Sequence, residues 1–291
     1  MPLKPVAFCA SLLTAMFLST AVSAEHHDPA YWAEAEHRSE ANKHRNQYRN
    51  PAETLAFFGI SSDMTVIEVW PGRGWYTEIL APWLHHGGGR LIAAGWPADM
   101  GPEWRLNFRA EYNQWLEDNQ SLFGEVKVTE LGPENHWSIA EPGSADAIVT
   151  FRNVHNWLAG DYAEKAFHAM FRALKPGGIL GVVDHRAKAG TDLETMKKSG
   201  YITEAKVVEL AGLAGFVFEA GSEINANPLD STNHPAGVWT LPPALRLGDE
   251  QREHYLQIGE SDRLTLRFRK PIDADDREHC SCQEDPLSES P

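Results

Sequence analysis

The fold of this chain is decided by residues 66–76, Val66-Ile67-Glu68-Val69-Trp70-Pro71-Gly72-Arg73-Gly74-Trp75-Tyr76. An apolar, β-branched run ends in a glycine-containing turn, and a helical pattern follows over residues 75–84. A strand that enters a helix through such a turn is the opening unit of a doubly wound α/β nucleotide-binding fold. Gly72 and Gly74 allow a tight turn, and Glu68 is expected to face the ligand crevice. A Gly-x-Gly pair alone also occurs in ordinary strand–helix turns, so the rest of the chain must support this interpretation.

Six further stretches have the composition of strands, and helical patterns separate most of them. They are residues 90–95, 126–131, 147–151, 179–184, 215–220 and 263–269. The run at 179–184 is continuously apolar, as expected of a strand buried on both faces. Strands that alternate with helices indicate a mostly parallel sheet covered on both sides. The predicted fold class is therefore α/β, a doubly wound, mostly parallel, seven-stranded Rossmann-like sheet.

Helix signals occupy the segments between these strands. Over residues 103–118, aromatic side chains recur at spacings of three or four, which predicts a buried helix face. These side chains are Trp104, Phe108, Tyr112 and Trp115. Asp161 and Glu164 resemble a capping box for the helix that ends before Lys175-Pro176-Gly177-Gly178. Thr203 resembles the N-cap of the next helix.

Composition divides the chain into four parts. Residues 1–24 combine Lys4, an apolar run and the small residues Ala21-Val22-Ser23-Ala24, which predicts a secretion signal cleaved after Ala24. A periplasmic or secreted location follows from this prediction. Residues 25–60 are expected to form an N-terminal helical cap, and residues 61–270 the α/β domain. Within that domain, residues 221–262 form a long connection that is a candidate lid. Residues 271–291 are an acidic tail whose composition predicts disorder.

Charge and cysteine content narrow the classes of partner. The formal net charge is −15, and no basic stripe is visible, so we expect neither nucleic acid nor an anionic membrane surface as a partner. After signal cleavage only Cys280 and Cys282 remain, in the tail. Their spacing disfavours a disulfide within the pair, and an exposed pair is the expected state. The histidines and carboxylates show no recognised metal-ligand spacing, so we expect no metal site. The sequence gives no expectation for the oligomeric state.

Polar residues gather after two of the predicted strands. Arg152, Asn153, His155 and Asn156 follow the fourth strand, and residues 184–186 end the fifth. Carboxyl ends of parallel strands are where α/β folds bind ligands. Because a histidine titrates near neutral pH, His155 is a candidate general base. A hydrogen-bonded structural histidine is an equally good explanation of this position.

Across residues 50–270 the sequence resembles class I S-adenosylmethionine (SAM)-dependent methyltransferases. The stretch Glu68–Gly74 is similar to their acidic-x-Gly-x-Gly-x-Gly motif, with Trp70 in place of the first glycine. Leu174-Lys175-Pro176-Gly177-Gly178 before the fifth strand is a common sequence in the same superfamily. The string Trp-Pro-Gly-x-Gly-Trp-Tyr also resembles a group of predicted bacterial methyltransferases that carry secretion signals.

This resemblance implies a SAM site and assigns residues to it. The implied cofactor-binding residues are Glu68, Trp70, Gly72, Gly74, Asp99, Arg152 and Asn153. The family usually has an acidic residue at the end of the second strand, which binds the ribose hydroxyls. Here that strand ends in Ala94-Gly95-Trp96, so Asp99, the nearest acidic residue, is included in its place. His155 is implied as the catalytic residue near the methyl acceptor. The residues expected near the substrate are Asn156, Asn227, Asp230 and Trp239.

These observations favour a SAM-dependent methyltransferase that acts on a small-molecule acceptor. Because an exported enzyme needs SAM outside the cytoplasm, the alternative is an exported, non-catalytic binding protein on the same fold. A nicotinamide-dependent oxidoreductase ranks last, because Arg73–Thr77 lacks the third glycine of Gly-x-Gly-x-x-Gly.

Overall fold

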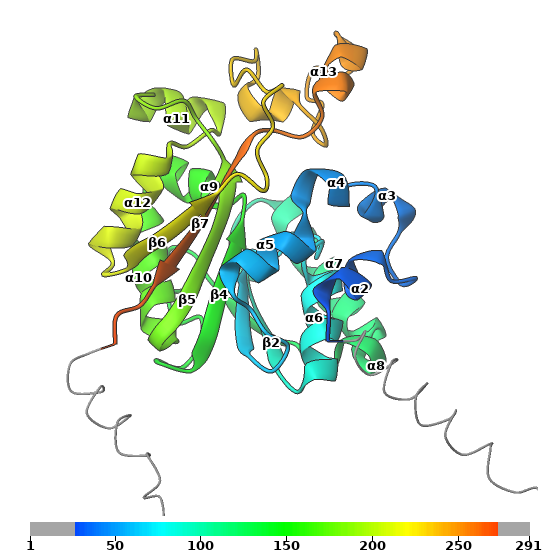
Figure 1. Cartoon of the computed structure of the whole chain (residues 1–291), viewed down its shortest axis with the longest axis vertical. Helices are drawn as coiled ribbons and strands as arrows, with labels where there is room; N and C mark the ends of the chain where they lie inside the picture. Colours follow the sequence, from blue (N-terminus) through cyan, green and yellow to red (C-terminus); the bar gives the residue numbers. More distant parts are fainter. Residues whose placement is uncertain (1–26, 273–291) are drawn as a thin grey trace, which may run out of the picture.

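The computed structural model describes residues 27–272, which form a seven-stranded sheet between two layers of helices (Figure 1). The strands are β1 Thr65–Val69, β2 Arg90–Gly95, β3 Lys127–Glu130, β4 Ala145–Phe151, β5 Leu174–His185, β6 Val217–Ser222 and β7 Arg263–Arg269. The secretion signal, the acidic tail, Cys280 and Cys282 lie outside the described residues, so those predictions remain predictions.

The sheet has the strand order β3-β2-β1-β4-β5-β7-β6. Neighbours from β3 to β5 are parallel, and β7 runs antiparallel to both β5 and β6. The predicted fold class, a doubly wound and mostly parallel α/β sheet, is confirmed. The strand order reverses between β1 and β4, and such a switch point leaves a crevice at the carboxyl ends of the strands.

Helices precede the sheet, connect its strands and cover both of its faces. They are α2 Pro29–Glu34, α3 Glu40–Lys43, α4 Asn46–Arg49, α5 Pro51–Phe58, α6 Thr77–Gly87, α7 Glu103–Asp118, α8 Gln120–Phe123, α9 Val154–Ala159, α10 Ala163–Ala173, α11 Leu193–Ser199, α12 Glu204–Leu213, the 3₁₀ turn η1 Gly237–Thr240 and α13 Arg252–Ile258. Helices α2 to α5 occupy the segment that the sequence assigns to an N-terminal cap. Within residues 27–272, no helix combines the length and apolar composition needed to cross a bilayer.

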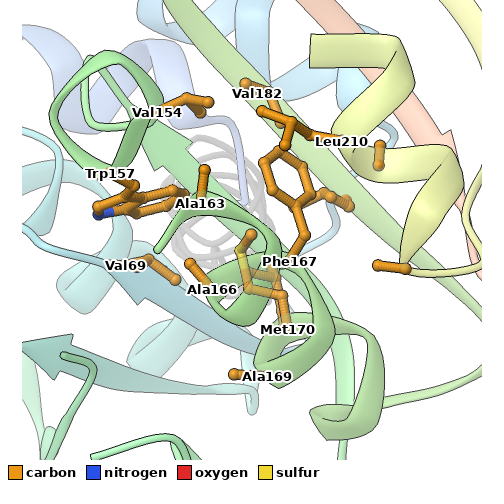
Figure 2. Close-up of a cluster of buried hydrophobic side chains, with 14 of the residues drawn as sticks. Val69, Val154, Trp157, Ala163, Ala166, Phe167, Ala169, Met170, Val182 and Leu210 are labelled. Atoms are coloured by element: carbon orange, nitrogen blue, oxygen red, sulfur yellow. The ribbon is translucent and has the colours of Figure 1, made fainter. Parts of the chain in front are cut away.

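Two apolar cores, one on each face of the sheet, follow from the alternation of side chains along β1. Ile67 and Val69 join the core beneath α9, α10 and α12, where Trp157 and Phe167 are fully buried (Figure 2). Val66 points to the opposite face and packs with side chains of α2, α5 and α6. Since alternate residues share a face, Glu68 lies on the same side as Val66 and reaches the start of α6.

The boundaries differ from the sequence predictions at several points. β5 begins at Leu174 rather than 179, because Leu174 already pairs with Ala145 across a register shift. β6 begins at Val217, two residues later than predicted, since the backbone N–H of Phe216 still donates to Ala211 O at the end of α12. The predicted N-cap Thr203 is confirmed, because its side chain accepts from the N–H of Lys206.

One helix prediction was wrong, and the other, over residues 103–118, was confirmed in its bounds but only partly in the burial of its aromatic face. The capping box at Asp161 does not form, because α10 begins at Ala163, its N-cap is Tyr162, and Asp161 instead pairs with Lys197. The aromatic stripe of α7 is only partly buried, since Tyr112 is buried but Trp104 is 50% exposed.

Candidate functional site

A cleft of about 430 Å³ lies at the carboxyl ends of β1, β2, β4 and β5. One wall comes from the segment of α3 and α4, and another from residues 238–244 of the long connection. A larger hollow of about 610 Å³ lies at the amino ends of β1, β2 and β3, where Thr65, Arg90 and Lys127 begin these strands. Because α/β folds bind ligands at carboxyl ends, the cleft is the candidate functional site.

The turn after β1 opens directly into this cleft. Gly72 has φ +63°, and a Cβ at that position would meet nothing within 4 Å, so the backbone here borders open space. Gly74 also has positive φ, but a Cβ there would lie 2.6 Å from the ring of Trp115. Gly72 therefore leaves room for a ligand, whereas Gly74 allows α7 to pack closely against the turn.

Trp70 occupies the position of the first glycine in the acidic-x-Gly-x-Gly-x-Gly motif. Its backbone conformation is one that glycine adopts easily. Its φ is +51°, in the left-handed region that non-glycine residues rarely adopt. The indole is nevertheless held firmly, because its Nε1 donates to Leu131 O at 2.8 Å and its ring packs edge-on against Trp96 and Trp157. Trp70 thus lines the cleft through an anchored ring.

Glu68 lies at the floor of the cleft and is almost completely buried, at 2% exposure. The hydroxyl of Thr77 donates to its Oε2 at 2.6 Å, and Tyr112 Oη lies 3.0 Å from the same hydroxyl. Burial raises the pKa of Glu68 to about 7, with the Thr77 hydrogen bond opposing the shift. A carboxyl with this pKa can ionise when a cationic group enters the cleft.

His155 and Asp184 form a buried pair at the ends of β4 and β5. His155 Nδ1 lies 2.8 Å from Asp184 Oδ1, and the backbone N–H of His155 donates to Asp184 Oδ2. The backbone N–H of His185 donates to Asp184 Oδ1 at 2.7 Å. The ring of His155 lies 5.0 Å from that of His185 and 6.2 Å from that of Trp239. With Nδ1 held by Asp184, Nε2 is the ring nitrogen of His155 left to act on a ligand.

The same three residues also form a donor set that sequence spacing does not reveal. One ligand atom each from His155, Asp184 and His185 lie within 4.8 Å of one another, and all three residues are buried. Burial, followed by the electrostatic effect of His155, holds the pKa of His185 well below its usual range, so its ring is neutral. Asp184 already accepts from three N–H or ring-nitrogen groups, which favours a hydrogen-bonded pair over a metal ligand. A second group, Asp99, Glu130 and His136, lies outside the cleft.

Arg152 and Asn153 have different roles at the end of β4. The side-chain amide of Asn153 donates to Val69 O at 2.8 Å, so it fastens the end of β4 to the end of β1. Arg152 has φ +62°, and its guanidinium makes no hydrogen bond or ion pair with any other residue of 27–272. Both residues line the cleft, and so does Asn156, which is exposed.

Three residues predicted for the site lie elsewhere. The side chain of Asp99 is 77% exposed, lies near His136 and does not line the cleft. The amide of Asn227 donates to the carbonyls of Ile258 and Glu260, so it holds the long connection. Asp230 is buried against Tyr201, His234 and the backbone of residue 262. Both residues were predicted from their place in a long polar connection, and both are consumed by its internal hydrogen bonds.

Other residues of the cleft were missed by the sequence analysis. Trp96 replaces the expected acid at the end of β2, and its Nε1 is buried with no hydrogen-bond partner in the described part of the chain. Arg45 and Arg49 enter the cleft from the N-terminal segment. The Arg-x-x-x-Arg spacing at 45–49 was the only available signal, and it is common on solvated helices.

Comparisons with known proteins support the fold. No protein-family model and no curated protein matches the sequence. A solved SAM-dependent methyltransferase from Aquifex aeolicus superposes with a TM-score of 0.50 at 16% identity, covering 78% of this chain and 92% of that chain. The cyclase SpnF superposes with a TM-score of 0.52 at 15% identity, covering 92% of this chain and 98% of that chain. At such identities the similarity is one of fold, and this chain therefore shares its Rossmann-like α/β fold with these two proteins.

Proposed function

We propose that the protein is a methyltransferase that binds SAM in the cleft and methylates a small-molecule acceptor. The observation that carries the proposal is that the open turn at Gly72, the buried acid Glu68 and the His155–Asp184 pair all border one cleft. The fold is shared with a SAM-dependent methyltransferase, and it is shared equally with a cyclase, so the site must decide the chemistry.

The residues of the cleft fit the parts of SAM. Gly72 leaves space at its Cβ position for the methionine portion, and Glu68 offers a carboxylate to a cationic group beside it. Trp96 supplies an aromatic ring and an unpartnered N–H at the end of β2, where a nucleoside hydroxyl can accept it. This tryptophan takes the place of the ribose-binding acid that the sequence analysis assigned to Asp99. When bound, SAM supplies an electrophilic methyl group.

His155 is the residue of this chain suited to remove a proton from the acceptor. Its Nδ1 is oriented by Asp184 at 2.8 Å, which leaves Nε2 to accept the proton. Trp239 and Leu241 of the long connection close the cleft beside this ring, so they exclude water and help to position the acceptor. Since methyl transfer depends mainly on alignment of the reacting groups, this enclosure matters as much as the base.

Isothermal titration of SAM, S-adenosylhomocysteine (SAH) and NAD⁺ tests the proposal, with protein purified after expression of the full 291-residue chain. We expect SAM and SAH to bind with a Kd of about 1–10 μM, roughly −7 to −8 kcal/mol, and NAD⁺ not to bind. Absence of SAM and SAH binding by protein with a cooperative thermal transition would overturn the proposal. The mass of the purified protein shows in the same preparation whether cleavage after Ala24 has taken place.

A further inference from the structure

Four arginines surround a single glutamate beside the cleft, and we call these five residues the arginine group. They are Arg45, Arg49, Arg152, Arg263 and Glu260. Arg45 Nε and Arg49 Nε donate to the two oxygens of Glu260 at 2.6 and 3.2 Å, and Arg263 donates to the same carboxylate. The members come from α4 and the residues before it, the end of β4, and the start of β7, so only the fold brings them together.

The charges of the arginine group do not balance. Glu260 neutralises one of the four positive charges, and the guanidinium groups hold the pKa of its carboxyl well below the usual range even though burial opposes this. Burial and the charge of Arg263 lower the pKa of Arg152 to about 10, and Glu260 opposes this shift. Burial, followed by the charge of Arg152, also lowers the pKa of Arg49 well below its usual value. Nearby Asp184 is occupied by its three hydrogen bonds at His155 and His185.

Donors in this group are left without partners where it meets the cleft. Arg45 Nη2 and Arg49 Nη2 are buried and have no hydrogen-bond partner among the described residues. Arg45, Arg49 and Arg152 all line the cleft, and Arg49 is only 3% exposed. Leaving a charged donor buried and unpaired costs more than an ordinary hydrogen bond contributes. The chain as a whole carries a net charge of −15, so this local excess of positive charge runs against the overall composition.

Backbone geometry adds an independent sign of function at Arg152. Its φ of +62° places a non-glycine residue in the sterically strained left-handed region. Such strain persists where the surrounding structure fixes it, and it concentrates at ligand sites. Here the neighbouring Asn153 fixes it, because its amide bonds to the backbone of β1. The strained residue therefore faces the cleft, where His155 lies three residues further along the chain.

We propose that the arginine group binds an anionic group, a carboxylate or a phosphate, carried by the methyl acceptor. The statement that the anion belongs to a methyl acceptor rests on the proposed function. The anion site itself is inferred from the arginines alone. Guanidinium groups pair with carboxylate and phosphate oxygens through two parallel N–H donors. An anion seated against Arg152 lies next to His155, so it holds the acceptor beside the residue that accepts its proton. The other anion that competes for this position is the carboxylate of SAM itself.

Titration with inorganic phosphate distinguishes these two sources. Phosphate is titrated into the purified full-chain protein alone and again with saturating SAH, which carries the same carboxylate as SAM. We expect a phosphate Kd of about 1 mM or tighter in both cases, with a change below threefold when SAH is present. Loss of phosphate binding in the presence of SAH would show that the arginines serve the cofactor, and it would overturn the inference.

Two variants and a matched control test which residues bind the phosphate. The inference reassigns Arg152 from the cofactor, where the sequence resemblance put it, to the acceptor. Arg152→Gln is therefore expected to weaken phosphate binding at least tenfold and to leave SAH affinity within threefold of the unchanged protein. Arg252→Gln, an exposed position on α13 outside the cleft, is expected to change neither. If Arg152→Gln does not fold, Arg45→Gln is the second variant, because its side chain lines the same cleft and is 23% exposed. Unchanged phosphate binding in a folded Arg152→Gln or Arg45→Gln protein contradicts the inference.

The two proposals fail separately. If SAH does not bind, the methyltransferase proposal is wrong, and phosphate titration without SAH still decides whether the arginines form an anion site. If SAH binds and phosphate does not, the cofactor site stands and the acceptor is not recognised through an anion at these arginines.

Discussion

At the scale of single residues, the two glycines of the turn after β1 have separable roles. Gly72→Ala places a methyl group in open space beside the cleft, at a left-handed backbone that costs an alanine about 1–2 kcal/mol. We expect SAH affinity to fall about tenfold, equivalent to 1.4 kcal/mol, while the protein stays folded. Gly74→Ala is the matched comparison, because its methyl would lie 2.6 Å from Trp115 and force α7 to shift. Urea unfolding should show a larger loss of stability for Gly74→Ala by about 1–3 kcal/mol. Full SAH affinity in Gly72→Ala would remove the turn from the cofactor site.

Glu68 gives a second prediction at this scale, in the dependence of stability on pH. Its pKa is about 7 in the folded protein, raised from an ordinary value of 4.5 by burial. Between these two values the folded state holds a proton that the unfolded state has released. Stability from this group is therefore fully present below about pH 4.5 and is lost as the pH rises to 7. Glu68→Gln mimics the protonated acid at every pH, since its amide oxygen can still accept from Thr77.

The pH effect is measured as the difference in unfolding free energy between wild type and Glu68→Gln. We expect the two proteins to be similar at pH 5 and the variant to be more stable at pH 8, by up to roughly 3 kcal/mol. Urea titrations at both pH values provide the comparison. A constant difference across this range would mean that Glu68 is ionised in the folded protein even at pH 5.

At the scale of elements, the long connection between β6 and β7 is fastened by one buried carboxylate. Asp230 accepts from Tyr201 Oη at 2.9 Å and from the N–H groups of residues 232 and 262, and it pairs with His234 Nε2 at 2.8 Å. Asp230→Ala leaves these donors buried without a partner, so we expect a loss of roughly 2–4 kcal/mol in unfolding free energy. The segment around residues 231–250 should also become at least tenfold more sensitive to proteolysis. Asp249→Ala, at an exposed position of the same connection, is the control and should change neither property.

The elements themselves were largely predictable from sequence, and their ends were less so. The apolar runs of β1 and β2 identify strands because strands buried on both faces tolerate few polar residues. The misplaced start of α10 has a physical cause. Asp161 has the right residue type for a cap, but its carboxylate is drawn to Lys197 on α11, a tertiary contact that local sequence does not encode. For the same reason Asn227 and Asp230 looked available for a substrate, whereas the folded connection uses both.

At the scale of the whole molecule, the site was predictable mainly where its residues lie at or just after the ends of strands. Glu68 lies near the end of β1, and Gly72 and His155 come shortly after β1 and β4, so a strand-end rule finds them. That rule finds Arg152 but not the rest of the arginine group, because Arg45, Arg152 and Arg263 are separated from one another by more than a hundred residues and meet only in the folded chain. An overall acidic composition also hides a local cationic site, since net charge averages over the surface.

Because the cleft is built from several parts of the chain, ligand binding should stabilise the molecule as a whole. The N-terminal segment supplies Arg45 and Arg49, the turn after β1 supplies Gly72, and the connection before β7 supplies Trp239. A ligand that binds only the folded state at 100 times its Kd adds about 2.7 kcal/mol of stability. For a chain of this size, that corresponds to a rise in Tm of about 5–10 °C. We therefore expect SAH to raise Tm by this amount and NAD⁺ to leave it unchanged. Thermal unfolding followed by circular dichroism should show one transition, with the same Tm at every wavelength. Two separate transitions, with only one raised by SAH, would contradict this expectation. The N-terminal segment or the connection would then unfold independently of the ligand site, and only the residues at the ends of the strands would bind the ligand.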